Sequence, residues 1–185
     1  MGYRLKSTIP SVTQVSERMA VDWVIGAFLM VRRAVLEKAG LLDEDFFMYA
    51  EEMEWCHRLR KHGTIALFGK PRVIHIGGGT STGTYQLQQW DNSKTLWTSK
   101  ARQIMLSSFL RVRKEFGIFW FLFTLGIYLF EIPVFGVGLV FDKIFRGTKA
   151  RYRWNHWTGY SQNVFYTCRF FFRILLNKPY FYKAR

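Results

Sequence analysis

The feature that most constrains the fold is an apolar stretch from residue 117 to residue 141, which contains one charged side chain, Glu131. A bilayer core takes about 20 apolar residues, so the stretch is long enough to cross a membrane; the alternative is a pair of helices buried in a soluble core. Glu131 and Pro133 interrupt its middle, where a carboxylate is most costly in lipid. Basic residues flank both ends, so no orientation is preferred. We therefore expect a helical hairpin that turns at Pro133 and dips into the membrane from one side.

Positive charge is concentrated in the same half of the chain. The 185 residues carry a net charge of +14, and from Lys100 to the end fifteen Lys and Arg stand against three acids. Such charge with interleaved aromatic residues is typical of proteins that bind nucleic acid or an anionic membrane surface. The sequence contains no RNA-recognition, zinc-finger or helix-turn-helix pattern, so we expect a membrane surface and no nucleic acid. Residues 117–185 are thus predicted to form a membrane-associated helical tail, including a surface helix at 170–176.

Acidic residues gather in one short run, residues 43–59, which holds six of the chain's thirteen Asp and Glu. From Glu51 onward, polar and apolar residues recur at three-and-four spacing, which predicts a helix with Glu54 paired to Arg58 one turn later. The run has two interpretations. It is an acid-rich helix start, stabilised by the helix dipole, or it is a general-base site, because burial and a like-charge neighbour both raise a carboxylate's pKa.

The residues around this run alternate between predicted strands and helices. We expect a connecting loop over 1–20, a buried strand or strand-turn element over 23–31, a short helix over 33–39 closed by Gly40, and strands over 65–68 and 72–76. An amphipathic helix follows over residues 97–112. The two cysteines, Cys56 and Cys168, form no CxxC pair, which is typical of reduced thiols in the cytosol. The alternation of strands and helices over 20–80 indicates part of an α/β sandwich.

Three blocks, residues 21–33, 40–52 and 75–81, resemble family 2 glycosyltransferases in order and spacing, particularly the bacterial rhamnosyltransferase-like branch. The resemblance implies the C-terminal, acceptor-side half of a GT-A-like nucleotide-sugar transferase sandwich over 21–116, followed by the apolar and amphipathic helices. It implies a divalent cation, Mg²⁺ or Mn²⁺, in the intact enzyme. The family's base motif is usually Glu-Asp, whereas this chain has Glu51-Glu52.

The resemblance also assigns candidate roles to residues. Glu52 would be the general base and Glu51 would tune it, while Glu54 and Arg58 form a structural pair beside them. Other positions would bind substrate. Asp22, Trp23 and Tyr49 would line the acceptor site. In the alternative interpretation, Trp23 is an ordinary core aromatic residue. The donor diphosphate and the metal would be held by residues at a strand end: His75, Gly77 and Gly78.

The family's donor-binding half, with its Asp-x-Asp metal motif, is not found before Val21. We therefore expect a fragment or a truncated gene product that binds metal weakly and transfers no sugar alone, with a separate N-terminal donor-binding half as a possible partner. The intact enzyme would transfer a sugar, with inversion, from a nucleotide-sugar donor to a lipid-linked or polysaccharide acceptor, at the cytoplasmic face of the bacterial inner membrane. The alternative is a catalytically inactive membrane-surface module or a degenerate partner subunit.

Overall fold

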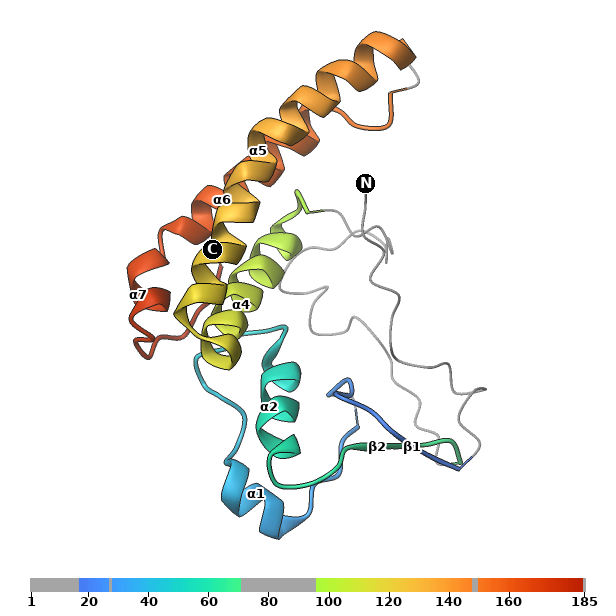
Figure 1. Cartoon of the computed structure of the whole chain (residues 1–185), viewed down its shortest axis with the longest axis vertical. Helices are drawn as coiled ribbons and strands as arrows, with labels where there is room; N and C mark the ends of the chain where they lie inside the picture. The colour runs from blue at the N-terminus through green and yellow to red at the C-terminus, as the bar shows by residue number, and fades with distance from the viewer. Residues whose placement is uncertain (1–16, 27, 71–95, 148–149, 185) are drawn as a thin grey trace. The chain divides into compact units, whose positions relative to one another are not determined.

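The computed structural model describes residues 17–26, 28–70, 96–147 and 150–184 (Figure 1). The chain divides into two compact units. The first comprises Met1–Asp43 and Glu51–Gly77, and the second comprises Glu44–Ala50 and Gly78–Arg185. Residues 44–50 of the acidic run therefore belong to the second unit, and its remaining residues belong to the first.

The first unit contains two short strands and two helices. Strands β1 (Arg18–Ala20) and β2 (Ala66–Phe68) pair antiparallel, with Met19 opposite Leu67. Helix α1 (Arg33–Ala39) ends at Gly40, whose φ of 76° is the left-handed conformation that favours glycine. Helix α2 (Glu51–Arg60) forms the second part of the acidic run. The core of this unit consists of four buried side chains: Ala39, Cys56, Leu59 and Ile65.

The predicted strand over 23–31 is wrong. The described residues of this segment are irregular, and the strand lies earlier, at Arg18–Ala20, inside the predicted loop. The apolar residues are nevertheless partly buried, as the pattern indicated, because Trp23, Val24 and Leu29 pack against the core. An apolar run predicts burial, but a strand also needs a hydrogen-bonding partner, and the ladder to β2 ends just past Ala20 with Val21 N–H donating to Ile65 O at 3.0 Å. The predicted strand over 72–76 lies outside the described residues.

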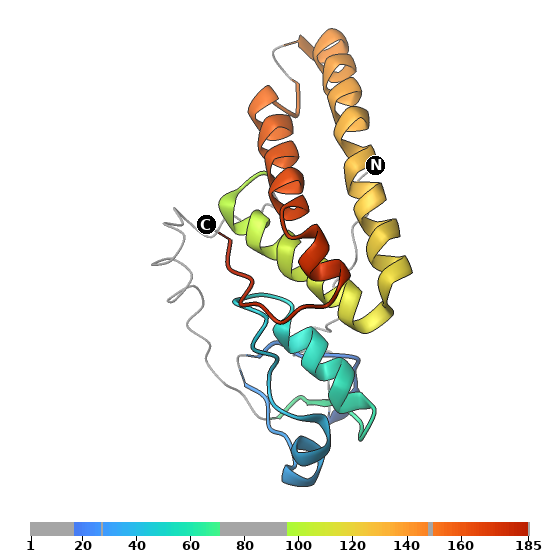
Figure 2. The same ribbon diagram turned by 90° about the vertical axis from the view of Figure 1, so that its left-hand side faces the viewer.

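The second unit is helical. Its described residues form α4 (Ser99–Phe116), α5 (Ile118–Arg146), α6 (Trp154–Cys168) and α7 (Phe171–Leu175). Helices α4, α5 and α6 pack against one another, and α5 and α6 run side by side (Figures 1 and 2). The amphipathic pattern predicted α4 correctly, and its N-cap is Thr98, whose Oγ1 accepts a hydrogen bond from Ala101 N–H at 3.1 Å.

An aromatic core holds these helices together. Phe109 of α4 contacts two rings of α5, with centroids 6.1 Å from Phe121 and 5.0 Å from Tyr128. The buried Gln103 ties the C-terminal segment to α4, since its Nε2 donates to Tyr182 O at 2.9 Å and its Oε1 accepts from Ala184 N–H at 2.7 Å. The second unit thus has a larger apolar core than the first.

The predicted hairpin at Pro133 is wrong, because α5 continues through this proline as one helix of 29 residues. Proline removes one backbone hydrogen bond from a helix. Helix α6 supplies support at this point: Trp157 Nε1 donates to Ile132 O at 2.8 Å, and Tyr160 Oη donates to Glu131 Oε2 at 2.7 Å. Helix α5 therefore continues through the residues that suggested a turn, and α6 contacts it there.

By length and composition, α5 is the one helix of the described residues that could cross a membrane, with a mean hydropathy of 1.9. The predicted surface helix at 170–176 is present as α7, in which Phe172 is exposed. Helices dominate the described residues, and their sheet has two strands. The α/β expectation is thus met only in its coarse form, since a GT-A-like sandwich is not shown.

Candidate functional site

The candidate site lies in the first turn of α2, which begins with Glu51, Glu52 and, one residue further on, Glu54. The two residues immediately before the helix, Tyr49 and Ala50, have φ values of 69° and 66°. L-residues with a Cβ rarely adopt this left-handed conformation, and it costs on the order of 1 kcal/mol per residue. Strained backbone of this kind concentrates at functional sites, where surrounding structure over-determines it. The turn at these two residues sets the direction of the backbone at the start of α2.

Burial and mutual repulsion set the charge of the pair. Burial is the main cause that raises the pKa of Glu51 to about 7; the negative charge of Glu52 and a side-chain hydrogen bond with Glu52 contribute in the same direction, and a backbone hydrogen bond acts in the opposite direction. The Oε2 atoms of Glu51 and Glu52 are both buried and have no hydrogen-bond partner among the described residues. Near neutral pH Glu51 therefore exchanges a proton readily, which is the property a general base requires.

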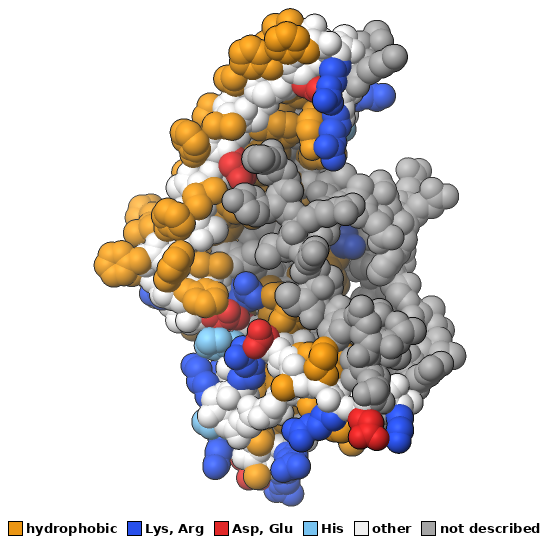
Figure 3. Space-filling view, turned by 45° about the vertical axis from the view of Figure 1, so that its right-hand side comes forward, with side chains coloured by type: hydrophobic (Ala, Val, Ile, Leu, Met, Phe, Trp, Pro, Cys, Tyr) orange, Lys and Arg blue, Asp and Glu red, His pale blue; other side chains and the backbone are white. Residues whose placement is uncertain are grey.

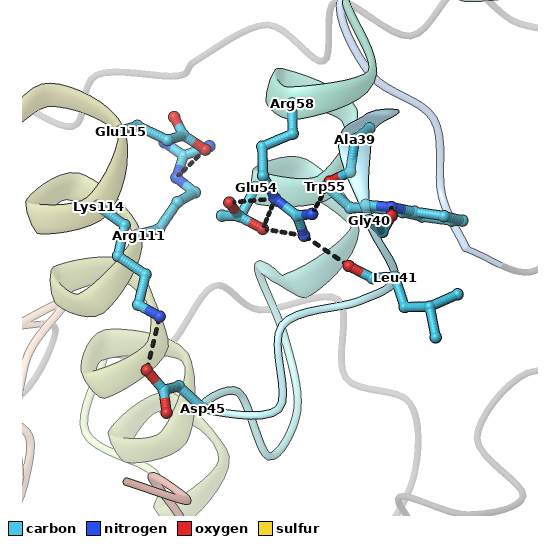
Figure 4. Close-up of polar contacts among 10 residues, drawn as sticks. All are labelled: Ala39, Gly40, Leu41, Asp45, Glu54, Trp55, Arg58, Arg111, Lys114 and Glu115. Carbon is cyan, nitrogen blue, oxygen red and sulfur yellow. Dashed lines mark hydrogen bonds and ion pairs between the residues drawn. The ribbon is translucent and has the colours of Figure 1, made fainter. Parts of the chain in front are cut away.

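The neighbouring carboxylate, Glu54, is in a different situation. It is buried and paired with Arg58, whose Nε lies 2.8 Å from Glu54 Oε1. Arg58 Nη2 also donates to Leu41 O at 2.8 Å, and Trp55 Nε1 donates to Gly40 O at 2.8 Å (Figure 4). The predicted Glu54–Arg58 pair is thus present, and it fastens the end of α1 to α2. Because Glu54 is paired, the candidates for proton transfer in the first turn are Glu51 and Glu52.

Gly26 approaches this pair from the irregular segment. A Cβ atom at position 26 would lie 3.7 Å from Glu52 Cβ and 4.0 Å from Glu52 Oε1. The absence of a side chain at Gly26 therefore leaves space beside one oxygen of Glu52. In the sequence, Gly26 is one residue of an apolar run. No local pattern connects it to Glu52, which lies 26 positions later.

The residues predicted to bind the acceptor are placed as follows. Asp22 is exposed, and its Oδ1 lies 3.0 Å from Arg60 Nη1, at the rim of a depression of about 460 Å³ lined by both residues together with Gly63 and Thr64. Trp23 is half-buried against the first core, as its alternative interpretation predicted. Neither residue is shown to bind an acceptor.

Tyr49 belongs to the second unit, where its ring centroid lies 5.7 Å from Lys100 Nζ. In the same unit, Asp45 Oδ2 accepts from Lys114 Nζ at 2.6 Å (Figure 4). These contacts hold the loop between residues 44 and 50 on the second unit. The predicted diphosphate and metal residues, His75, Gly77 and Gly78, lie outside the described residues. In the part of the chain that is described, no three His, Cys, Asp or Glu side chains gather as a metal site would require.

Comparison with known proteins relates the chain to glycosyltransferases. A stretch of 41 residues is 46% identical to the low-salt glycan biosynthesis hexosyltransferase Agl10 of Haloferax volcanii and covers 22% of this chain and 13% of that protein. A stretch of 61 residues is 38% identical to the N-acetylglucosaminyl-diphospho-decaprenol L-rhamnosyltransferase of Mycobacterium tuberculosis and covers 32% of this chain and 20% of that protein. The matches thus span a fifth or less of each curated relative. No family model and no solved structure matches the chain. At this coarse level, the chain is similar to transferases of glycan biosynthesis.

Proposed function

We propose that this chain supplies the acceptor-side part of a glycosyltransferase, in which the Glu51–Glu52 pair takes the proton of the acceptor hydroxyl. One observation carries the proposal: two adjacent carboxylates, each with a buried oxygen that has no hydrogen-bond partner among the described residues, and a pKa near 7 for Glu51. The similarity to two glycosyltransferases supports the reaction class. A nucleotide-sugar donor and a lipid-linked or polysaccharide acceptor follow from that class.

In this mechanism Glu52 is the base, and Gly26, whose missing side chain leaves room for a carbon atom 4.0 Å from Glu52 Oε1, lies beside it. The hydroxyl loses its proton to Glu52 while its oxygen attacks the anomeric carbon in line, and the nucleoside diphosphate leaves from the opposite face with inversion. Glu51, the adjacent carboxylate, would hold Glu52 in position. A divalent cation, Mg²⁺ or Mn²⁺, would stabilise the departing diphosphate. His75, Gly77 and Gly78 remain the candidates of this chain for that end of the reaction.

Site variants test the proposal in the intact enzyme. Glu52→Gln should lower sugar transfer by about 10²–10⁴-fold, the usual contribution of a general base, while donor binding stays unchanged. Glu44→Gln is the matched control, because Glu44 is an exposed acid of the same run. Full activity in Glu52→Gln would overturn the assignment of the base, and loss in Glu51→Gln alone would transfer that role to Glu51.

A second readout needs only this chain. A carbon-13 NMR titration of the glutamate carboxyl groups should place the pKa of Glu51 near 7. In Glu52→Gln that pKa should fall, because the repelling charge is gone, and it should stay above its ordinary value because burial remains. An unshifted Glu51 in the wild-type chain would remove the physical basis of the proposal.

A further inference from the structure

Helix α5 is apolar on its outer side as well as on its packed side. About 3.6 residues make one turn, and the side chains that face the other helices recur at that spacing: Phe121, Leu125, Tyr128, Ile132, Phe135 and Leu139. The opposite side is exposed and equally apolar: Phe119, Phe123, Phe130, Val134, Val137, Phe141 and Phe145. We call these seven residues the outer face of α5. Figure 3 shows hydrophobic side chains gathered along this helix.

Every charged residue of α5 is tied to the α6 side of the helix. Glu131 accepts from Tyr160, and Asp142 Oδ2 accepts from Arg151 N–H at 2.7 Å. Lys143 Nζ lies 5.2 Å from the ring centroid of Trp154, and Arg146 pairs with Asp142 at 3.5 Å. The outer face is therefore free of charge over the whole of α5, all of whose residues are described. A helix that is apolar all round is normally buried in a core or in lipid, yet the outer face of α5 is exposed.

Helix α6 argues against a crossing. It lies along α5, to which it is joined by Trp157 and Tyr160, and it exposes Asn155, Thr158 and Gln162. If α5 crossed the bilayer, these side chains would enter the hydrocarbon with it, and polar side chains are costly there. Lying in the plane of the membrane instead immerses the outer face and leaves α6 in water or among headgroups.

The charge of this part of the chain selects the occupant. From Lys100 onward fifteen Lys and Arg stand against three acids. Two copies of such a surface repel each other, whereas an anionic leaflet attracts it by about 1 kcal/mol per basic residue near the surface. Aromatic rings beside cations, as in the Lys143–Trp154 pair and in Arg173, which lies 4.2 Å from the ring centroid of Tyr180, are typical of membrane interfaces.

We propose that α5 is a monotopic membrane anchor, whose outer face lies in one leaflet of an anionic bilayer while both of its ends stay on the same side. The proposal does not depend on glycosyl transfer. It replaces the hairpin predicted from the sequence with a straight helix that lies in the interface.

Vesicle flotation of the full chain tests the attachment. The protein should float with phosphatidylcholine vesicles that contain about 30% phosphatidylglycerol, which makes their surface anionic. It should be released as the salt concentration rises. The double variant Phe119→Asp/Phe130→Asp should lower partitioning about 100-fold or more, because it removes two immersed rings and adds negative charge. These side chains are 84% and 70% exposed, so the fold should survive, which circular dichroism checks. Met30→Asp, at an 83% exposed residue of the first unit, is the matched control.

Depth measurements distinguish an interfacial helix from a crossing helix. Nitroxide labels would be placed singly at positions 119, 130, 137 and 145, in a background where Cys56 and Cys168 are replaced by Ala. An interfacial helix gives the same shallow depth at all four positions. A profile that is deepest at 130 and 137 and shallow at 119 and 145 would establish a crossing and overturn the proposal. A dimer in solution that does not float, or flotation unaffected by the double variant, would overturn it as well.

Discussion

The two units of this chain are held together by different kinds of interaction. The first unit buries four apolar side chains, and its helices are fastened by Arg58, which bonds to Glu54 and to backbone carbonyls of the α1 end. The second unit buries eleven residues in one cluster, and aromatic rings connect α4, α5 and α7. The geometry of the first unit therefore depends on charge, and that of the second depends on apolar volume.

This difference matters for what each unit does. A unit that holds its shape through a small core and an ion pair can carry further carboxylates whose protonation responds to pH, as Glu51 does. A unit with a dense aromatic core can leave one apolar helix face uncovered without collapsing around it. The proposed acid–base chemistry belongs to the first unit and the proposed surface attachment to the second, and three measurements can break or sharpen this comparison.

The largest effect should come from the aromatic core. Phe109→Ala removes a ring that is 1% exposed and that contacts Phe121 and Tyr128. We expect the free energy of unfolding to fall by about 3–5 kcal/mol, measured by urea denaturation followed by circular dichroism. Phe165→Ala, at a ring that is 58% exposed, should change it by less than about 0.5 kcal/mol. Equal effects of the two variants would show that the ring cluster does not carry the stability of this unit.

The sequence predicted the parts of the fold that depend on local pattern. Helices α1 and α2, the glycine that ends α1, the Glu54–Arg58 pair and the amphipathic α4 were all predicted, because capping and one-turn spacing act between neighbours along the chain. The strand over 23–31 and the turn at Pro133 were wrong, because each depends on a partner distant in sequence: a strand ladder in one case and Trp157 and Tyr160 of α6 in the other.

The candidate site divides in the same way. Acidic spacing pointed to Glu51 and Glu52, but it did not show that burial in the folded chain raises the pKa of Glu51. The left-handed turn at Tyr49 and Ala50 gave no sequence signal, as neither residue is a glycine or an asparagine. No sequence pattern indicated the space beside Gly26 either. The acceptor roles of Asp22, Trp23 and Tyr49 stay predictions.

An effect of similar or smaller size should come from the ion pair of the first unit. Arg58→Ala leaves the buried carboxylate of Glu54 without its cation, and breaking a buried pair in this way costs about 3 kcal/mol. Arg33→Ala is the matched control, because the Arg33–Glu37 pair has the same spacing but side chains that are 91% and 61% exposed, and it should cost less than about 1 kcal/mol. Thermal unfolding of the two variants measures the difference. A cost for Arg58→Ala no larger than that of the control would mean that the small core, not the charge, holds the first unit.

The smallest effect, and the one that separates the two units most clearly, is the pH dependence of Glu51. Its folded pKa of about 7 lies above the ordinary 4.5, so the folded state binds a proton more tightly than the unfolded chain does. The stability linked to this proton is fully present below pH 4.5 and is lost as the pH rises toward about 7. Because water still reaches the half-buried side chain, we expect a loss of about 1 kcal/mol rather than the full value of the shift.

Glu51→Gln should remove this loss, because an amide does not titrate, and the variant should therefore be more stable than the wild type at pH 8 and similar to it at pH 4.5. Glu37→Gln, at an exposed acid of α1, should follow the wild-type curve. The measurement is urea denaturation at half-unit pH steps, with tryptophan fluorescence reporting the first unit through Trp23 and Trp55 in variants where the tryptophans of the second unit are replaced by Phe. The difference between wild type and Glu51→Gln cancels the repulsion among the many basic residues, which both proteins share. A difference that does not change between pH 4.5 and pH 8 would show that Glu51 is an ordinary exposed acid, and it would leave the first unit with no carboxylate poised near neutral pH.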